Sequence, residues 1–256
     1  MKRLWNNFKV AFAMFSKIPM PRADWDKENM KYMLCFFPFV GMVIGGLTMA
    51  AGYLLSLGEF RPEFKTVVLM LIPVLVTGGI HVDGLLDTAD ALSSWQERSR
   101  RLEILKDSHA GAFAVITACV YFLALYGACS QLIPHREALW VFSLGFMVSR
   151  CLSGIAVVCF PKARADGTVA QFSRNASDVV TRNVLILYLL IIFACMLWMN
   201  PVFAAGAMAA ALVMFWYYHH MALKYFGGTT GDLSGAFLCL CEVGMALVLA
   251  VVSHVI

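Results

Sequence analysis

The chain has 256 residues, of which 61% are hydrophobic and only 14% are charged, and its formal net charge is +4. Soluble domains are nearer half apolar and a quarter charged, so this composition excludes an ordinary soluble domain and predicts a polytopic membrane protein. The eight cysteines form no CxxC pair and most lie in apolar runs, which argues against a disulfide framework or a zinc site.

The N-terminal segment 1–20 predicts an amphipathic helix. Apolar side chains line one helical face, and lysines and arginines lie elsewhere on it; the apolar residues are Leu4, Trp5, Phe8, Phe12 and Phe15. This pattern is typical of a helix that lies on an anionic membrane surface. The alternative, an ordinary polar leader to the first membrane span, stays open.

Seven apolar stretches are long enough to cross roughly 30 Å of hydrocarbon. They lie at about 33–57, 66–86, 110–132, 137–160, 183–199, 201–221 and 235–255. The stretch 66–86 is the weakest, because its last turn carries acidic residues. The sequence therefore predicts an all-α fold: a single integral membrane domain over 1–256, built as a bundle of about seven transmembrane helices plus the N-terminal interfacial helix.

The basic residues predict the orientation of these spans. With the N-terminus inside, the cytoplasmic segments hold seven, four, four and one Lys or Arg, sixteen of the twenty; these segments are 1–32, 87–109, 161–182 and 222–234. The opposite side holds only Arg61, Lys65 and Arg136, and Arg150 lies within a span. The positive-inside rule therefore predicts a cytoplasmic N-terminus.

Three carboxylates, Asp83, Asp87 and Asp90, lie at the end of the second apolar stretch. Their i, i+4, i+7 spacing places them within an arc of roughly 60° on one helical face. They repel one another, and each costs roughly 2.5–3.5 kcal/mol near the hydrocarbon. A divalent cation would offset both penalties, and a cation held by oxygen ligands is the usual partner of phosphates. We therefore predict metal-dependent phosphoryl chemistry here; the alternative is a solvated polar face.

Two more polar elements adjoin helix ends on the same predicted side. Asp107 and Ser108 precede the third span and are preceded by Lys106. We predict Asp107 as a metal ligand and Lys106 as a phosphate contact, although helix capping and membrane orientation are equally open roles for them.

The second element is the glycine-rich segment 227–235, which leads into the last span and contains Thr230, Gly231 and Asp232. Glycines let backbone amides approach an anion, and a helix N-terminus favours negative charge. Asp232 is predicted as a further metal ligand, against the alternative of a flexible loop with Asp232 as helix cap.

Intramembrane charges require a partner or a function. For Arg150, a salt bridge with Glu242 and a contact with substrate phosphate are both open. His81 points away from the aspartates in an ideal helix, so we place it near the site without a firm role.

In combination, these residues resemble a known family, the cobalamin synthases, which are adenosylcobinamide-GDP ribazoletransferases. The matching pieces are 15–21, 78–90, 106–108 with Gly111, 149–150, 163–164 with Gly167, and 227–232. Ala91 and His109 depart from the glycine and arginine usual in the family, which puts fine substrate contacts in doubt more than the chemistry.

The resemblance implies an enzyme that joins adenosylcobinamide-GDP to α-ribazole or its 5′-phosphate and releases GMP. It also implies Mg²⁺ and a multi-pass protein of the bacterial cell inner membrane, with the site facing the cytoplasm. We expect Asp90 to accept the proton, and no nucleic-acid partner; a homo-oligomer is left open. The expected substrate-binding residues are His81, Lys106, Ser108, Arg150, Arg164, Thr230 and Gly231.

Two other functions compete with this one. A CDP-alcohol phosphotransferase also uses aspartates on membrane helices with a divalent metal, but its Asp-Gly…Ala-Arg arrangement is not reproduced here. A cation-coupled transporter would place its acids near the bilayer midplane, whereas the predicted acids gather at one face.

Overall fold

The computed structural model describes residues 2–25, 30–107, 109–164 and 178–255. Regular secondary structure within these ranges is helical. The elements are α1 (Lys2–Phe15), α3 (Met33–Ser56), α4 (Pro62–Thr77), α5 (Ile80–Ser93), α6 (Arg98–Ile104), α7 (Ala112–Leu132), α8 (Arg136–Cys159), α10 (Asp178–Met199), α11 (Pro201–Met221), the short π-helix η1 (Ala222–Phe226) and α12 (Gly231–Val252).

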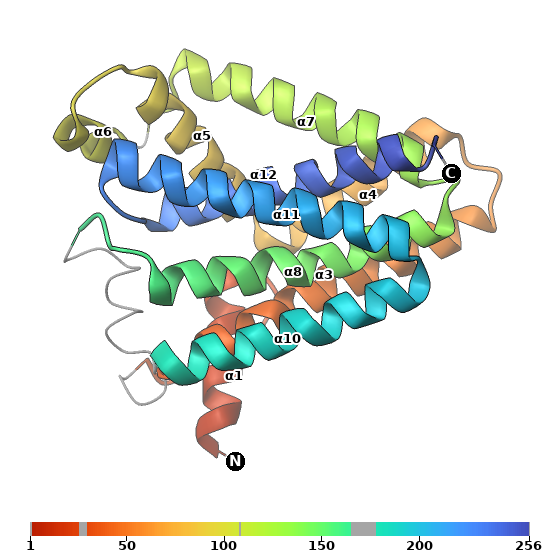
Figure 1. Ribbon diagram of the computed structural model, residues 1–256, viewed down its shortest axis with the longest axis horizontal. Helices are drawn as coiled ribbons and strands as arrows, with labels where there is room; N and C mark the ends of the chain where they lie inside the picture. Colours follow the sequence, from red (N-terminus) through yellow and green to blue (C-terminus); the bar gives the residue numbers. More distant parts are fainter. Residues whose placement is uncertain (1, 26–29, 108, 165–177, 256) are drawn as a thin grey trace.

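The long helices run side by side as a bundle, with α8 and α12 most deeply buried (Figure 1). Six helices of the described chain are long and apolar enough to cross a membrane, and they match six of the seven predicted spans within a few residues: α3, α7, α8, α10, α11 continued by η1, and α12. The outer helices expose apolar side chains such as Leu123, Leu190 and Val213. A helix bundle with an apolar exterior is the structure of a multi-pass membrane protein.

Glycines set how closely α3 approaches α8. A Cβ atom on Gly41 or Gly45 would collide with the backbone carbonyl groups of Phe146 and Ser143, respectively. The GxxxG spacing of these two residues therefore permits backbone contact between the helices, as such motifs do in membranes.

The predicted second span, 66–86, is wrong as a single helix. The chain instead forms α4 and α5, which meet at an angle of 91°. Gly78 and Gly79 have φ angles of 67° and 81°, values that favour glycine. The side chain of Lys17 packs against Gly78. The backbone N–H of Lys17 donates a hydrogen bond to the carbonyl oxygen of Val76 over 2.8 Å. The bend turns α5, with its aspartates, toward the end of the bundle where α7 and α12 begin (Figure 1).

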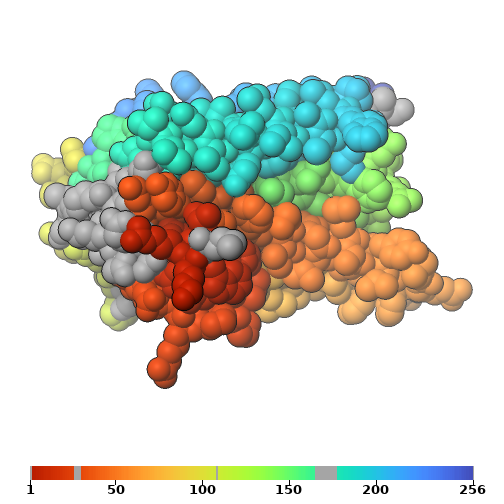
Figure 2. All heavy atoms as spheres, turned by 90° about the horizontal axis from the view of Figure 1, so that it is seen from below, coloured from red at the N-terminus to blue at the C-terminus, as the bar shows by residue number. Residues whose placement is uncertain are grey.

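The predicted N-terminal helix exists as α1, and it is fastened to the bundle. The side chain of Asn6 exchanges two hydrogen bonds with the backbone of Asp24, and Asn7 accepts one from the backbone N–H of Tyr32 over 2.7 Å. In the space-filling view the red N-terminal residues lie over the orange α3, beside the teal surface of α10 (Figure 2). Trp5, near the start of the helix, stays exposed.

Candidate functional site

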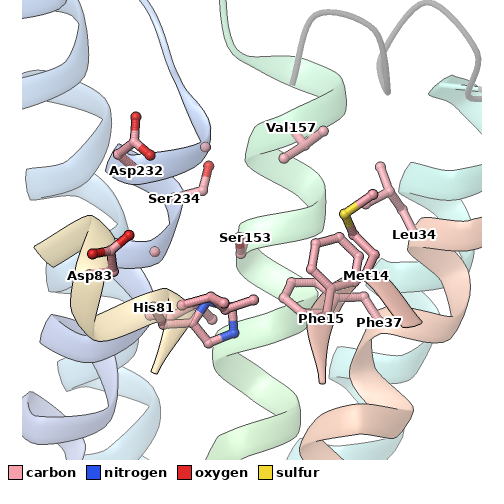
Figure 3. Close-up of a pocket in the computed structure, with 14 residues that line it drawn as sticks. Met14, Phe15, Leu34, Phe37, His81, Asp83, Ser153, Val157, Asp232 and Ser234 are labelled. Carbon is pink, nitrogen blue, oxygen red and sulfur yellow. The ribbon is translucent and has the colours of Figure 1, made fainter. Parts of the chain in front are cut away.

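A pocket of about 270 Å³ lies where α5 and the start of α12 face α1, α3 and α8. Its lining has two chemically different walls, visible in Figure 3. Polar groups of Asp83, Asp232, Ser153 and Ser234 form one, together with His81, Gly231 and Gly235. Apolar side chains form the other, contributed by Met14, Phe15, Leu34, Phe37 and Val157.

Two glycines bring the acidic helices together. A Cβ atom on Gly84 of α5 would lie 2.6 Å from the backbone oxygen of Asp232, and one on Gly235 of α12 would lie 3.2 Å from the backbone oxygen of His81. The backbones of α5 and α12 therefore touch at this level. Residues 83 and 232, far apart in sequence, line one pocket because no side chain separates their helices.

The start of α12 differs from the prediction. The helix begins at Gly231 rather than at about residue 235, so Asp232 and Ser234 belong to its first turn. Thr230 is its N-cap, and the Thr230 hydroxyl accepts a hydrogen bond from the N–H of Leu233 over 3.2 Å. Gly231 has open space beside it. Of the glycines expected to admit an anion, Gly231 and Gly235 both line the pocket, and Gly235 also packs against the backbone of α5.

The carboxylates of α5 act on one another electrostatically. Asp83 is exposed, whereas Asp87 is half-buried and lies beyond the apolar stretch 66–86. Partial burial raises the pKa of Asp87 to about 6, and the negative charges of Asp83, Asp232, Asp90 and Asp107 add to this shift. Crowding of this kind penalises the ionised form, and a bound cation would reverse the penalty.

Asp90 has a structural role that the sequence did not reveal. Its two carboxylate oxygens accept hydrogen bonds from the backbone N–H groups of Gly111, over 2.6 Å, and Ala114, over 2.9 Å. These amides are the free donors at the start of α7, where a negative charge is also favoured. Asp90 therefore joins the C-terminal part of α5 to α7.

The segment before α7 is only partly brought to the site. Asp107 is exposed, and hydrogen bonds from the ring and backbone of His109 lower the pKa of its carboxyl group. The negative charge of Asp107 contributes to the raised pKa of Asp87. Lys106 is exposed, and no contact between it and the aspartates is found in the described chain. Ser108 lies outside the described residues.

A short backbone pairing fixes the approach to α12. The N–H of Thr229 donates to the carbonyl oxygen of Pro161 over 2.8 Å, and the N–H of Ala163 donates to the Thr229 carbonyl over 3.1 Å. The Tyr218 hydroxyl hydrogen-bonds both Thr229 and Ser234, the latter over 2.9 Å. The segment that the sequence left open as a flexible loop is thus anchored on both sides.

Basic groups approach the site from α6 and from the segment after α8. Arg164 donates to the backbone oxygen of Leu102, and its charge acts on Asp232. The guanidinium group of Arg98 packs against Gly227, whose φ of 70° favours glycine. Arg164 therefore lies near Asp232, and its expected contact with substrate stays a prediction. Arg98 is a further cation, which lies beside the glycine-rich segment.

Arg150 lies in the core of the bundle, where it is fully buried. Its guanidinium group contacts Glu242 at 2.6 Å and donates to the backbone oxygen of Phe146. Ser149 also donates to the Glu242 carboxylate over 2.9 Å. Of the two roles left open by the sequence, the structure supports the salt bridge, and it leaves the expected substrate contact of Arg150 without support.

His81 lies in the pocket, although an ideal helix turned it away from the aspartates. It lines the same cavity as Asp83, and its ring centroid lies 6.2 Å from that of Phe37 (Figure 3). The apolar wall did not follow from the sequence. Phe15 lies on the apolar face of a helix expected to contact lipid, and Phe37 lies within a predicted membrane span. No periodicity distinguishes an aromatic residue that faces a pocket from one that faces lipid.

The donor chemistry of this site fits a hard divalent cation. Carboxylate oxygens are the ligands that Mg²⁺ prefers, and in the described ranges no ion pair joins Asp83, Asp87 or Asp232 to a lysine or arginine. However, no three His, Cys, Asp or Glu side chains of the described chain already surround a metal-sized space. The site therefore has suitable metal ligands, but in this structure they do not converge on one metal position.

A substitution at Gly84 tests the contact between the acidic helices. We expect Gly84→Val to lower the activity of the protein by about 100-fold, because an offset of about 1 Å between reacting groups has this effect. The measurement is kcat of the purified protein, and circular dichroism checks that the variant is folded. Gly127→Val is the matched control, since Gly127 on α7 has open space beside it. Unchanged kcat in Gly84→Val would contradict the role given to this contact.

Comparison with known proteins supplies the family. The family model described as cobalamin-5-phosphate synthase matches residues 7–250. A relative from Lachnoclostridium phytofermentans, named adenosylcobinamide-GDP ribazoletransferase, is 44% identical over 96% of this chain and 94% of its own. Relatives of the same name from Desulfitobacterium hafniense and Clostridium botulinum are 32% and 26% identical, covering 94% and 95% of this chain and 94% and 96% of their own. No solved structure matches the chain. The resemblance drawn from the sequence motifs is confirmed, and the chain belongs to the cobalamin-5-phosphate synthase family.

Proposed function

We propose that the protein is a Mg²⁺-dependent adenosylcobinamide-GDP ribazoletransferase of the bacterial inner membrane. The observation that supports this most directly is the family match over nearly the whole chain, together with the pocket that Asp83 and Asp232 share. The relatives named above all carry the ribazoletransferase name, which favours this function over the CDP-alcohol phosphotransferase and the transporter. The end of the bundle that carries the site is the end that the basic residues predict to face the cytoplasm.

The proposed reaction is a phosphoryl transfer. A hydroxyl oxygen of α-ribazole, or of its 5′-phosphate, attacks the phosphorus attached to the cobinamide. The new phosphorus–oxygen bond forms as the phosphoanhydride bond to GMP breaks, and the hydroxyl proton passes to a carboxylate. Negative charge therefore builds up on the transferred phosphoryl group and on the departing GMP.

Residues of this chain supply the ligands for the metal. Asp83 and Asp232, which share the pocket, would hold Mg²⁺, and Asp87, Asp90 and Asp107 lie close enough for their charges to contribute. The ion, when bound, neutralises the charge that develops on the diphosphate. We assign Arg164 and the amide of Gly231 to the phosphate oxygens, because both are near Asp232 at the start of α12.

The proton acceptor is better assigned to Asp87 than to Asp90. Both oxygens of Asp90 already accept backbone hydrogen bonds at the start of α7. Asp87 has no such bond among the described residues and lies between Asp83 and Asp90 on the same helical face. A general base needs a free lone pair within reach of the proton that it abstracts.

The test is GMP release by the purified protein in detergent or lipid nanodiscs. We expect release only when adenosylcobinamide-GDP, α-ribazole and Mg²⁺ are all present, with loss of activity on chelation and recovery on adding Mg²⁺. Omission of α-ribazole is the control for simple hydrolysis. The same protein should not release CMP from a CDP-alcohol. Failure to release GMP in the complete mixture, or equal release without the acceptor, would contradict the proposal.

A further inference from the structure

The pocket contains a buried polar group that lacks a partner. The side chain of His81 is 8% exposed, and its Nε2 atom has no hydrogen-bond partner among the residues that the structure describes. A buried imidazole nitrogen normally has a partner, because leaving it unpaired costs the full desolvation penalty. His81 also lines the cavity, so a ligand there can hydrogen-bond the imidazole, in which either nitrogen can carry the proton.

Aromatic side chains stand on the other side of this imidazole. The rings of Phe15 and Phe37 lie 4.1 Å apart between centroids, tilted by 35°, and the centroid of the Phe37 ring lies 6.2 Å from that of His81. Figure 3 shows the His81 side chain between α5 and these two rings. Flat aromatic groups bind against such rings by offset or edge-to-face packing.

Polar groups border the same cavity toward the acids. The hydroxyl groups of Ser153 and Ser234 and the carboxylates of Asp83 and Asp232 all line it. A molecule that fills the pocket must therefore be planar and apolar at one end and rich in hydroxyl groups at the other. A nucleoside has this division, since its base is flat and its sugar carries the hydroxyl groups.

Size decides between the two substrates. The cavity, at about 270 Å³, is near the lower limit of small-molecule pockets. A nucleoside is of this size, whereas a corrinoid macrocycle with its side chains is several times larger and must remain outside.

We propose that this pocket binds the aromatic base of the nucleoside acceptor against His81 and the rings of Phe15 and Phe37, which line it together. The sugar then faces Asp83 and Asp232, which places a hydroxyl group beside the carboxylates. His81 acts as a positioning residue through a hydrogen bond to the acceptor, and Phe37 supplies specificity for a flat base. The inference rests on the proposed function and extends it by naming which substrate occupies the pocket and how it is held.

Replacement of His81 by phenylalanine gives the sharpest test. We expect His81→Phe to raise KM for α-ribazole about tenfold and to leave KM for adenosylcobinamide-GDP within about twofold of its normal value. The fall in kcat should be a smaller factor than the rise in KM for α-ribazole. The melting temperature should be unchanged or higher, because the substitution removes an unpaired buried nitrogen without breaking a hydrogen bond of the protein. His81→Gln, which keeps a hydrogen-bonding group, should restore part of the affinity.

Matched variants separate the pocket from general effects. Phe37→Leu should raise KM for α-ribazole about tenfold, whereas Phe36→Leu on the same helix should not, because Phe36 packs against Phe8 and Phe39 outside the pocket. His220→Phe is the control for His81, since His220 is exposed and stacks on Trp216.

A measurement on the unaltered protein does not depend on any variant folding. The free base of α-ribazole should inhibit competitively against α-ribazole and not against adenosylcobinamide-GDP. Equilibrium dialysis should also show α-ribazole binding in the absence of the corrinoid. If His81→Phe raises KM for the corrinoid alone, or if the free base does not compete with α-ribazole, the proposal is overturned. Absence of GMP release with binding of α-ribazole intact would instead contradict the proposed function and leave the pocket assignment standing.

Discussion

Asp83→Asn is expected to lower turnover by about a thousandfold while the protein still folds in the membrane. The Asp83 carboxylate is exposed in the pocket and supports no described hydrogen bond, so its charge is not needed for packing. Its loss would remove a ligand for the cation that stabilises the transferred phosphoryl group, which is worth several kcal/mol of transition-state energy. The measurements are kcat and the Mg²⁺ concentration that gives half-maximal activity, which should rise.

Controls distinguish this result from a general charge effect. Glu63→Gln makes the same change of charge in the first turn of α4, at the other end of the bundle, and should leave activity intact. Asp232→Asn should resemble Asp83→Asn. Asp90→Asn should differ from both, because it weakens the link between α5 and α7 and so lowers the melting temperature as well. Wild-type activity of Asp83→Asn would remove the metal-ligand assignment.

Glu242→Leu is expected to lower the stability of the folded protein by about 3–5 kcal/mol, or its melting temperature by about 10 °C. The substitution leaves the Arg150 guanidinium group fully buried without its counter-charge. Two of its nitrogen atoms, Nε and Nη2, already have no partner among the described residues, so little else could compensate. Thermal unfolding in detergent, followed by circular dichroism, measures the effect.

A double substitution shows whether Arg150 has any role beyond this pair. Arg150→Met combined with Glu242→Leu should recover most of the lost stability, because removing both charges avoids the unpaired one. If the pair is only structural, GMP release should recover with stability. Recovery of stability without activity would return Arg150 to the substrate contacts expected from the sequence. A Glu242→Leu protein with an unchanged melting temperature would contradict the salt bridge.

The helical class and six of the seven spans could be predicted because the signal is local. A membrane span requires about twenty apolar residues in succession, and stretches such as 201–221 meet this requirement by themselves. The second span is two helices rather than one, for an equally local reason that hydropathy does not measure. Gly78 and Gly79 both take left-handed backbone angles and bend the chain by 91° inside a continuous apolar run.

The site could be predicted only in part. The spacing of Asp83, Asp87 and Asp90 already placed three carboxylates on one face, and the glycine-rich segment before the last span added Asp232. Their different surroundings did not follow from spacing. Asp90 is held by the first amides of α7, which have no partner within their own helix, and it can reach them only because α7 begins beside α5.

By itself, the sequence determined that this chain is a helical membrane protein with acidic residues at one predicted face, because hydropathy and helical periodicity are properties of consecutive residues. Only the tertiary structure decided that Gly84 and Gly235 let α5 and α12 touch, and that Phe37 and His81 line the same pocket. These contacts join residues more than forty positions apart. Their geometry depends on which helices pack together, and no local pattern encodes that choice.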